Sequence, residues 1–270
     1  MKVMGIVNVT PDSFSDGGEF FDHEKAIEHG MELVRQGADV LDIGGESTRP
    51  GAEDVALEEE LRRVMPVVEG LAGVAPVSID TTKAEVARQA LGAGARIVND
   101  VTALRGDPEM AEVCAEGGAE LVLMHMLGTP RTMQVDPRYE DVVGEVSEFL
   151  AVQAGVAEAA GISREKLWID PGIGFGKTVD HNLALLGATR TFSETGLRVL
   201  VGPSRKSFIG KLSRDAPEPR RLGGTIAACL AAMEGGAAMV RVHDVGPIVQ
   251  AIRMAAAIAA GAAGPDPTRR

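Results

Sequence analysis

Polar and charged side chains stand at the ends of eight short apolar runs in this 270-residue chain. In chain order they are Asn8, Asp42, Asp80, Asn99 with Asp100, His125, Asp170, Ser204 with Arg205 and Lys206, and Arg241 with His243. Carboxylates and amides accept hydrogen bonds from a ligand, whereas lysine and arginine hold anions. If the ends of these runs lie together, they form one site that contains both kinds of group.

The runs belong to a pattern that repeats along the chain: a short β-branched run, a polar or glycine-rich loop, and a segment with helical period. Each run is nearly continuous in apolar residues, as in parallel strands that are buried on both faces. The predicted strands cover residues 3–8, 38–44, 76–80, 96–100, 120–125, 167–170, 198–202 and 237–243.

Amphipathic helices are predicted between the runs. Their apolar stripes are Ile27, Met31 and Val34, then Leu57, Leu61, Val64, Val68 and Leu71, and later Val142, Val146, Phe149 and Val156, with Gly161 as a stop. Eight units of strand and helix predict an α/β fold, a single-domain (β/α)8 TIM barrel over residues 1–260, followed by a disordered tail at 261–270. The alternative is an open doubly wound sheet, which usually has fewer strands at this length.

In such a barrel, catalytic groups lie at the carboxyl ends of the strands. A single aspartate there is often only the N-cap of the following helix. Asp42 fits this interpretation because two glycines follow it, and Asp100 fits because it faces opposite to Asn99. For these two positions we favour capping.

Capping does not explain the other strand-end residues, because caps need not converge on one place. Asp80, Asn99 and Asp170 come from different strands and would meet Lys206 and Arg241 at one mouth of the barrel. We therefore predict the functional site at this mouth.

The run "VRVH" places Arg241 and His243 two residues apart, hence on the same face of the last strand. A pair of this kind is more often structural, but at the end of strand eight it lies beside the usual phosphate position of a barrel, which favours anion binding. The loop "GGESTRPGAE" (44–53) is either a solvated turn or a loop that closes over an anion or an aromatic acid. The segment "DPGIGFGKT" (170–178) is rich in glycine but lacks the spacing of a phosphate loop.

Composition excludes several classes of protein. A net charge of −12 argues against binding to nucleic acid or to an anionic membrane surface. Cys114 and Cys229 lie in helix-like segments without a C-x-x-C pattern, which favours buried free thiols. The apolar run before Asn8 is too short for a signal peptide, and no run of 18 apolar residues occurs, so we expect a cytoplasmic protein.

The sequence resembles the dihydropteroate synthase family over essentially its whole length. The matching motifs are "GIVNVTPDSFSDGG", "DIGGESTRPGA", "SIDTTKAEV", "IVNDV", "DPGIGFGKT", "VGPSRKSFIG" and "VRVHDV", in family order. The family joins 6-hydroxymethyl-7,8-dihydropterin diphosphate to 4-aminobenzoate and releases diphosphate. The reaction needs no side-chain nucleophile, because departure of diphosphate leaves a cation at the pterin methylene that the amine attacks, an SN1-like course.

The resemblance implies a pterin site. The aspartate of the "DPG" motif, here Asp170, accepts from the 2-amino and N3–H donors of the pterin, and Asn99 and Asp80 satisfy the remaining ring nitrogens. Lys206 donates to the O4 and N5 side of the ring, and Arg241 stacks on the ring. The catalytic residues implied are Lys206, Arg241 and Asp80.

The resemblance also implies the sites of the other reactants. The diphosphate is held by Asn8, Thr48, Arg241 and His243, and Asn8 offers its amide oxygen to Mg²⁺, the implied cofactor, while the diphosphate supplies most other ligands. The residues implied for 4-aminobenzoate are Phe14, Arg49, Pro50, Phe175 and Ser207. This subsite is where sulfonamides act in the family.

Two other functions stay open from the residues. A pterin-binding methyltransferase has a similar barrel but does not need the "TPDSFSDGG" loop, the "ESTRPG" loop or the diphosphate pair. A non-catalytic pterin-binding homologue is expected to have lost Lys206 or Arg241, and neither is missing. The last helical segment, "PIVQAIRMAAAIAAGAAG", is apolar nearly all round, so it is either a capping helix of the barrel or the face of a homodimer.

Overall fold

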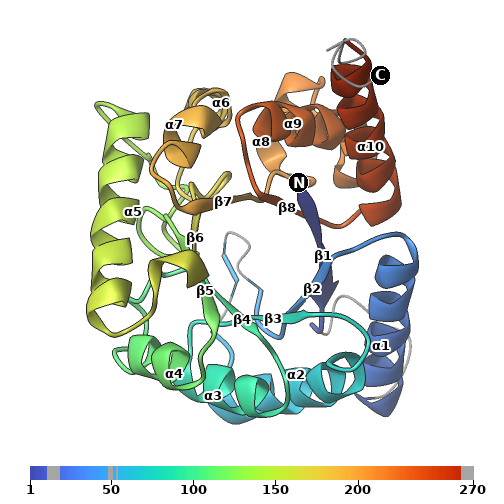
Figure 1. Ribbon diagram of the computed structural model, residues 1–270, viewed down its shortest axis with the longest axis vertical. Helices are drawn as coiled ribbons and strands as arrows, with labels where there is room; N and C mark the ends of the chain where they lie inside the picture. Colours follow the sequence, from blue (N-terminus) through green and yellow to red (C-terminus); the bar gives the residue numbers. More distant parts are fainter. Residues whose placement is uncertain (11–18, 48–50, 53, 263–270) are drawn as a thin grey trace, which may run out of the picture.

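A closed barrel of eight parallel strands forms the centre of the molecule (Figure 1). The computed structural model describes residues 1–10, 19–47, 51–52 and 54–262. The strands pair in chain order, and β8 closes the barrel against β1. The predicted (β/α)8 TIM barrel is confirmed, and the alternative prediction of an open doubly wound sheet is wrong.

The strands lie where the apolar runs predict them. They are β1 (Lys2–Asn8), β2 (Val40–Gly44), β3 (Val77–Asp80), β4 (Ile97–Asp100), β5 (Glu120–Met124), β6 (Leu167–Asp170), β7 (Arg198–Val201) and β8 (Met239–Val242). Almost every strand residue is buried, because helices cover the outer face and side chains fill the inside.

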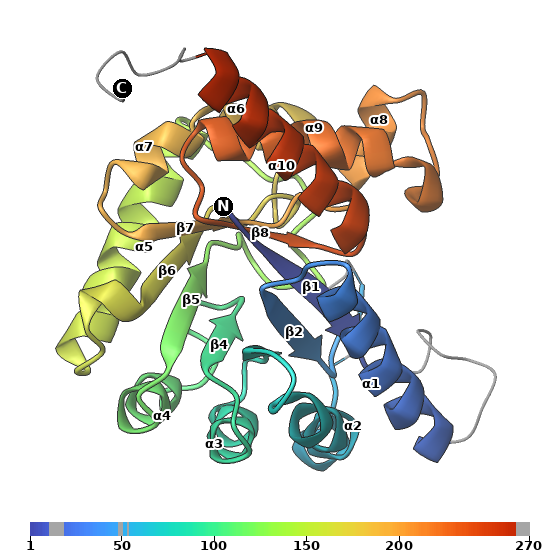
Figure 2. The same ribbon diagram turned by 45° about the vertical axis from the view of Figure 1, so that its right-hand side comes forward.

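A ring of helices surrounds the barrel (Figures 1 and 2). In the described part of the chain they are α1 (Glu19–Arg35), α2 (Leu57–Leu71), α3 (Ala84–Gly92), α4 (Met110–Glu116), α5 (Val142–Ala159), α6 (Val179–Gly187), α7 (Thr189–Ser193), α8 (Ser207–Leu212), α9 (Leu222–Glu234) and α10 (Val245–Ala262). Two crossovers carry an additional short helix each: α7 follows α6, and α8 precedes α9. Among these described helices, none combines the length and the apolar character that a bilayer crossing requires.

Small residues face the barrel beside the large ones on two helices. In α5 the buried positions include Ala154 and Ala157, while Val156 of the predicted stripe is 46% exposed. In α1, Gly30 lies so near α2 that a Cβ there would approach a methyl carbon of Leu71 to 2.6 Å, and Met31 is on the exposed side. The predicted stripes are therefore confirmed apart from Met31 and Val156, because their other members are buried or pack partly buried against the core: Ile27, Val34, Val142, Val146 and Phe149.

The inside of the barrel is layered. One apolar layer consists of Met4, Val40, Ile97, Val122, Trp168, Leu200 and Met239. Because successive inward-facing residues of a strand are two apart, the next layer toward the carboxyl ends is reached by adding two to each number. That step gives Ile6, Asp42, Asn99, Met124, Asp170, Gly202 and Arg241, so a layer with four polar side chains lies directly above the apolar one.

Candidate active site

Arg241 organises the polar layer. Its Nε donates to Oδ2 of Asp42 at 2.5 Å, and its terminal nitrogen donates to Oδ2 of Asp80 at 2.7 Å. The Asn99 amide nitrogen donates to the same Asp42 oxygen at 3.2 Å. Strands β2, β3, β4 and β8 thus share one network of charge-assisted hydrogen bonds at the mouth.

Asp42 is a correction to the sequence analysis, which favoured a helix cap there. Its side chain is fully buried and binds Arg241 inside the barrel, and α2 begins only at Leu57, fifteen residues later in numbering. Asp100 does face away from Asn99 as predicted. Its two oxygens accept backbone N–H groups of Thr102 and Leu104, so it stabilises a turn rather than a helix end.

Asp80 is also no cap, because α3 begins at Ala84, whose backbone N–H donates to Asp107 at 2.8 Å. Burial raises the pKa of the Asp80 carboxyl to about 7, and the nearby Asp42 adds to this, while Arg241 opposes it. Asp80 therefore depends on the Arg241 guanidinium to stay ionised near neutral pH.

Asp170 ends β6 and is 5% exposed. Its Oδ1 accepts the backbone N–H of Gly172 at 2.7 Å, whereas α6 is capped by Thr178, so the capping alternative for Asp170 is excluded. Burial raises the pKa of Asp170 to about 6, against the influence of nearby Lys206. An aspartate held in this way is an acceptor poised for a ligand with paired donors.

Gly202 keeps space open beside Asp170. It follows β7, and a Cβ built there would lie 3.8 Å from the Arg241 Cβ and 3.9 Å from the Asp170 Oδ2. Any larger side chain at this position would extend from β7 toward these two groups. The glycine is a site residue that sequence analysis missed, although the two-residue step from Leu200 points to it.

Lys206 lies in the loop that follows β7, at the N-cap of α8. Its Nζ lies 4.0 Å from the centroid of the Phe175 ring, a cation–π contact. Phe175 belongs to a small buried apolar cluster with Val101, Met124, Met126 and Met133. Ser207 is the first residue of α8 and is exposed.

His243 is a neutral imidazole. Burial lowers its pKa to about 3, and the charge of Arg241 acts in the same direction. The Ser204 hydroxyl accepts the His243 backbone N–H at 3.2 Å and lies 3.0 Å from its Nδ1. If the hydroxyl hydrogen is donated to Nδ1, the ring carries its proton on Nε2, which can donate to an anion.

The β2 and β3 loops are held by a second network that sequence analysis did not anticipate. Lys83 donates to Glu60 at 2.6 Å and to Glu46, and the Thr81 hydroxyl also donates to Glu60 at 2.7 Å. Glu60 is fully buried although it lies on α2. The network ties Glu46, near the start of the "ESTRPG" loop, to the core.

The remaining predicted residues are partly outside what the structure describes. Asn8 ends β1 and is half-buried, in register with Gly44 of β2. Phe14, Thr48, Arg49 and Pro50 lie outside the described residues. The described mouth therefore brings together Asp80, Asn99, Asp170, Lys206 and Arg241 as predicted, with Asp42 and Gly202 added.

Comparison with known proteins agrees with this geometry. The pterin binding enzyme family matches residues 4–243. A dihydropteroate synthase of Synechocystis is 49% identical over 259 residues, which are 95% of this chain and 89% of that protein. A structure of a Xanthomonas albilineans dihydropteroate synthase with 4-aminobenzoic acid has a TM-score of 0.91 at 49% identity, covering 96% of this chain and 93% of that one. Another structure from that organism, in complex with 7,8-dihydropteroate, has a TM-score of 0.87 at 46% identity and covers 96% of this chain and 94% of that one.

Proposed function

The chain belongs to the pterin-binding enzymes and, within them, to the dihydropteroate synthases. From this we propose a role for each side chain at the mouth in the dihydropteroate synthase reaction. The chain is a transferase that joins 6-hydroxymethyl-7,8-dihydropterin diphosphate to 4-aminobenzoate and forms 7,8-dihydropteroate and diphosphate. The relatives support this activity rather than a methyltransferase or a non-catalytic homologue.

The observation that carries the pterin assignment is the buried Asp170 beside the open side of Gly202. An ionised carboxylate accepts from both the 2-amino group and N3–H of a pterin. Asn99 donates through its amide nitrogen to Asp42, so its carbonyl oxygen is the atom available to accept from the ring. Asp80, with Arg241 bound to it, faces the remaining ring nitrogens.

Lys206 and Arg241 supply the positive charge of the site. Lys206 donates to O4 and N5 of the pterin, and Arg241 lies along the ring with its planar guanidinium. Asp42 and Asp80 anchor that guanidinium from behind. With Thr48, His243 and Asn8, Arg241 receives the diphosphate, and His243 contributes a neutral donor from Nε2.

The residues at the mouth fit a Mg²⁺ ion that the diphosphate brings with it. In the described part of the chain, no group of three or more His, Cys, Asp or Glu side chains is placed to hold a metal. Asn8, half-buried at the end of β1, offers one neutral oxygen, which suits a cation that keeps most of its ligands from phosphate and water. When bound, Mg²⁺ neutralises charge on the leaving diphosphate.

In the reaction, the bond between the pterin methylene and the diphosphate oxygen breaks, and the diphosphate leaves with the electron pair. The methylene cation is conjugated with the pterin ring that Asp170 and Asn99 orient. The amine of 4-aminobenzoate attacks this carbon and then loses a proton to the surrounding phosphate or water. The protein stabilises the leaving group and keeps water from the cation, which requires no covalent catalysis.

The 4-aminobenzoate subsite is assigned to Phe14, Arg49, Pro50, Phe175 and Ser207, which places it on the Phe175 side of the mouth. Sulfonamides would compete at the same subsite. A cytoplasmic location is supported by Cys114 and Cys229, which are buried free thiols.

The activity is tested with the purified chain, the pterin diphosphate, 4-aminobenzoate and Mg²⁺. Formation of dihydropteroate and of an equal amount of diphosphate is expected. Hydrolysis of the pterin diphosphate without transfer to 4-aminobenzoate would contradict the assignment.

Asn8→Ala removes one oxygen ligand from the ion but leaves the ligands of the diphosphate. We expect the Mg²⁺ titration of activity to shift to higher metal concentration, by several-fold for one lost ligand among about six. Binding of a pterin that lacks the diphosphate should not change, which calorimetry measures. An unshifted titration would mean that Asn8 only ends the strand.

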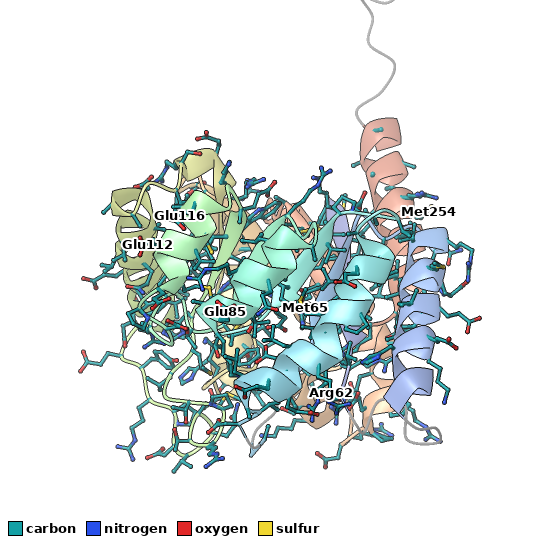
Figure 3. All side chains as sticks on the ribbon, turned by 90° about the horizontal axis from the view of Figure 1, so that it is seen from below. Arg62, Met65, Glu85, Glu112, Glu116 and Met254 are labelled. Atoms are coloured by element: carbon teal, nitrogen blue, oxygen red, sulfur yellow. The ribbon has the colours of Figure 1, made fainter. Side chains whose placement is uncertain are left out.

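A homodimer through the C-terminal helices is supported by α10. Its side chains Met254 and Ile258 are 61% and 64% exposed, and Figure 3 shows Met254 on the outer side of a helix that projects past its neighbours. Replacing both with lysine is expected to convert a dimer to a monomer in light scattering. Val152→Lys on α5, where the side chain is similarly exposed at 59%, is the control that keeps the wild-type mass. A wild-type monomer would contradict the dimer.

A further inference from the structure

The glycine-rich segment after β6 contains a lysine that the proposed reaction does not use. Lys177 is 3% exposed, and its Nζ lies 2.9 Å from the carbonyl oxygen of Phe175, 3.0 Å from Nδ1 of His125 and 3.3 Å from the carbonyl oxygen of His125. An ammonium has three hydrogens, and here three acceptors surround it. The lysine of this motif therefore points into the protein rather than toward a phosphate.

His125 is the right partner for such a donor. Burial lowers the pKa of His125 to about 3, and the charge of Lys177 acts in the same direction, so the ring is neutral and Nδ1 can accept. Edge-on contact with Phe149, at 4.9 Å between ring centroids, holds the imidazole in place. The acceptor side of the contact is thus held by α5 and by the end of β5, where the His125 backbone N–H donates to the Asp170 carbonyl at 3.0 Å.

The backbone of the segment is folded tightly against its neighbours. Gly172 has a φ of +69°, and a Cβ there would be 1.9 Å from the His125 carbonyl oxygen. Gly174 has a φ of +86°, and a Cβ there would be 2.9 Å from Cδ of Lys206. The segment thus packs against His125 at Gly172 and against Lys206 at Gly174. Neither contact leaves room for the backbone to shift.

We propose that Lys177 is a positioning residue that holds Phe175 under the Lys206 ammonium and so shapes the 4-aminobenzoate side of the mouth. Two contacts of Phe175 link the two lysines. Its carbonyl oxygen accepts from Lys177, and the centroid of its ring lies 4.0 Å from Nζ of Lys206. This role rests on the proposed function, which assigns Phe175 to 4-aminobenzoate and Lys206 to the pterin.

A lysine is a costly choice for packing alone. Burial lowers the pKa of Lys177 to about 7, with Asp170 acting the other way and Lys206 adding to the shift. An apolar side chain would fill such a site without a buried charge, although it would leave the two carbonyl groups unpaired. The retained ammonium is consistent with a geometric task at the neighbouring site.

The test is a double-mutant cycle of wild type, Lys177→Met, Phe175→Leu and the double variant, with KM measured for each substrate while the other is saturating. Loss of hydrogen bonds to a charged donor predicts that Lys177→Met raises KM for 4-aminobenzoate about tenfold. KM for the pterin diphosphate should change by less than about threefold, because Asp170 and Asn99 are not displaced and Lys177 acts on Asp170 only through its charge. In the Phe175→Leu background, Lys177→Met should add less than about twofold.

Lys166→Met is the matched control, because Lys166 also donates to a backbone carbonyl, that of Gly118 at 2.7 Å, but this bond is exposed and lies before β6, at the other end of the barrel. It should keep wild-type constants. If Lys177→Met cannot be purified in folded form, Lys177→Gln, whose amide still donates, enters the same cycle.

Two results would overturn the positioning role in an active enzyme: equal rises in KM for both substrates, or effects of Lys177→Met and Phe175→Leu that are independent of each other. A wild-type chain that forms no dihydropteroate would overturn the proposed function, and with it this role. The wild-type assay thus separates the two failures.

Discussion

Arg241→Met is expected to lower the free energy of unfolding by about 3–5 kcal/mol at pH 8, since it leaves buried carboxylates without their cation. The guanidinium donates to Asp42 at 2.5 Å and to Asp80 at 2.7 Å, and the Asp42 side chain is fully buried. Removing Arg241 alone destabilises the protein more than removing Arg241 together with Asp42 and Asp80. Without the guanidinium, the two carboxylates repel each other in a site of low polarity.

The loss of unfolding free energy caused by Arg241→Met should become smaller as the pH falls. Burial raises the pKa of Asp80 from 3.8 in the unfolded chain to about 7 in the wild type, so the folded state binds the additional proton and its stability declines as the pH rises through this range. Without Arg241 the pKa of Asp80 rises further. At pH 5.5 Asp80 is neutral in both proteins, whereas at pH 8 the variant must ionise it without a cation, so the stability difference between them is smaller at pH 5.5.

Urea unfolding of both proteins at pH 8 and pH 5.5 measures this effect. The control is Arg198→Met, an arginine at the opposite end of the barrel that pairs with Glu120 at 2.8 Å and is 32% exposed. This pair, together with the contact of the Arg198 guanidinium with the Trp168 ring at 4.0 Å, should contribute about 2 kcal/mol or less. A deficit for Arg241→Met that is equal at the two pH values, or larger at pH 5.5, would contradict the assigned network.

The fold could be predicted because each of the eight strands is an apolar run, rich in β-branched residues, in the sequence. The buried faces of α1 and α5 could be predicted only in part from large apolar residues. In α1 and α5 the barrel is approached by Gly30, Ala154 and Ala157, which a stripe of Val, Ile and Met does not reveal. Small residues allow a helix to pack closely on its neighbours. The positions of closest contact are therefore not the most hydrophobic ones, and a search for large apolar residues does not find them.

The site could be predicted where two independent signals agree, and not elsewhere. Asp80, Asn99 and Asp170 stand at strand ends and in family motifs. Asp42 stands in the middle of a strand that is buried on both faces, so burial does not reveal which side faces inward. Lys177 could not be assigned either, because the direction of a side chain in a glycine-rich loop depends on backbone angles that the sequence does not fix.

Asp170→Asn separates pterin binding from a structural role most sharply. The backbone N–H of Gly172 donates to Oδ1 at 2.7 Å, and in the variant it will keep the amide oxygen at that position. The amide NH2 then occupies the place of Oδ2, where it meets the donors of the pterin. A charge-assisted bond is lost and a buried donor is left unpaired, which together cost on the order of 2–5 kcal/mol.

This loss corresponds to a decrease in kcat/KM of roughly 30-fold to several-thousand-fold. The melting temperature should stay at or slightly above that of the wild type, because burial already raises the pKa of Asp170 to about 6 and the neutral amide removes that penalty. Asp141→Asn is the control for capping: Asp141 accepts the N–H of Val143 at the start of α5, and asparagine caps about as well as aspartate. An Asp170→Asn enzyme whose kcat/KM stays within about threefold of wild type would show that the pterin donors bind elsewhere.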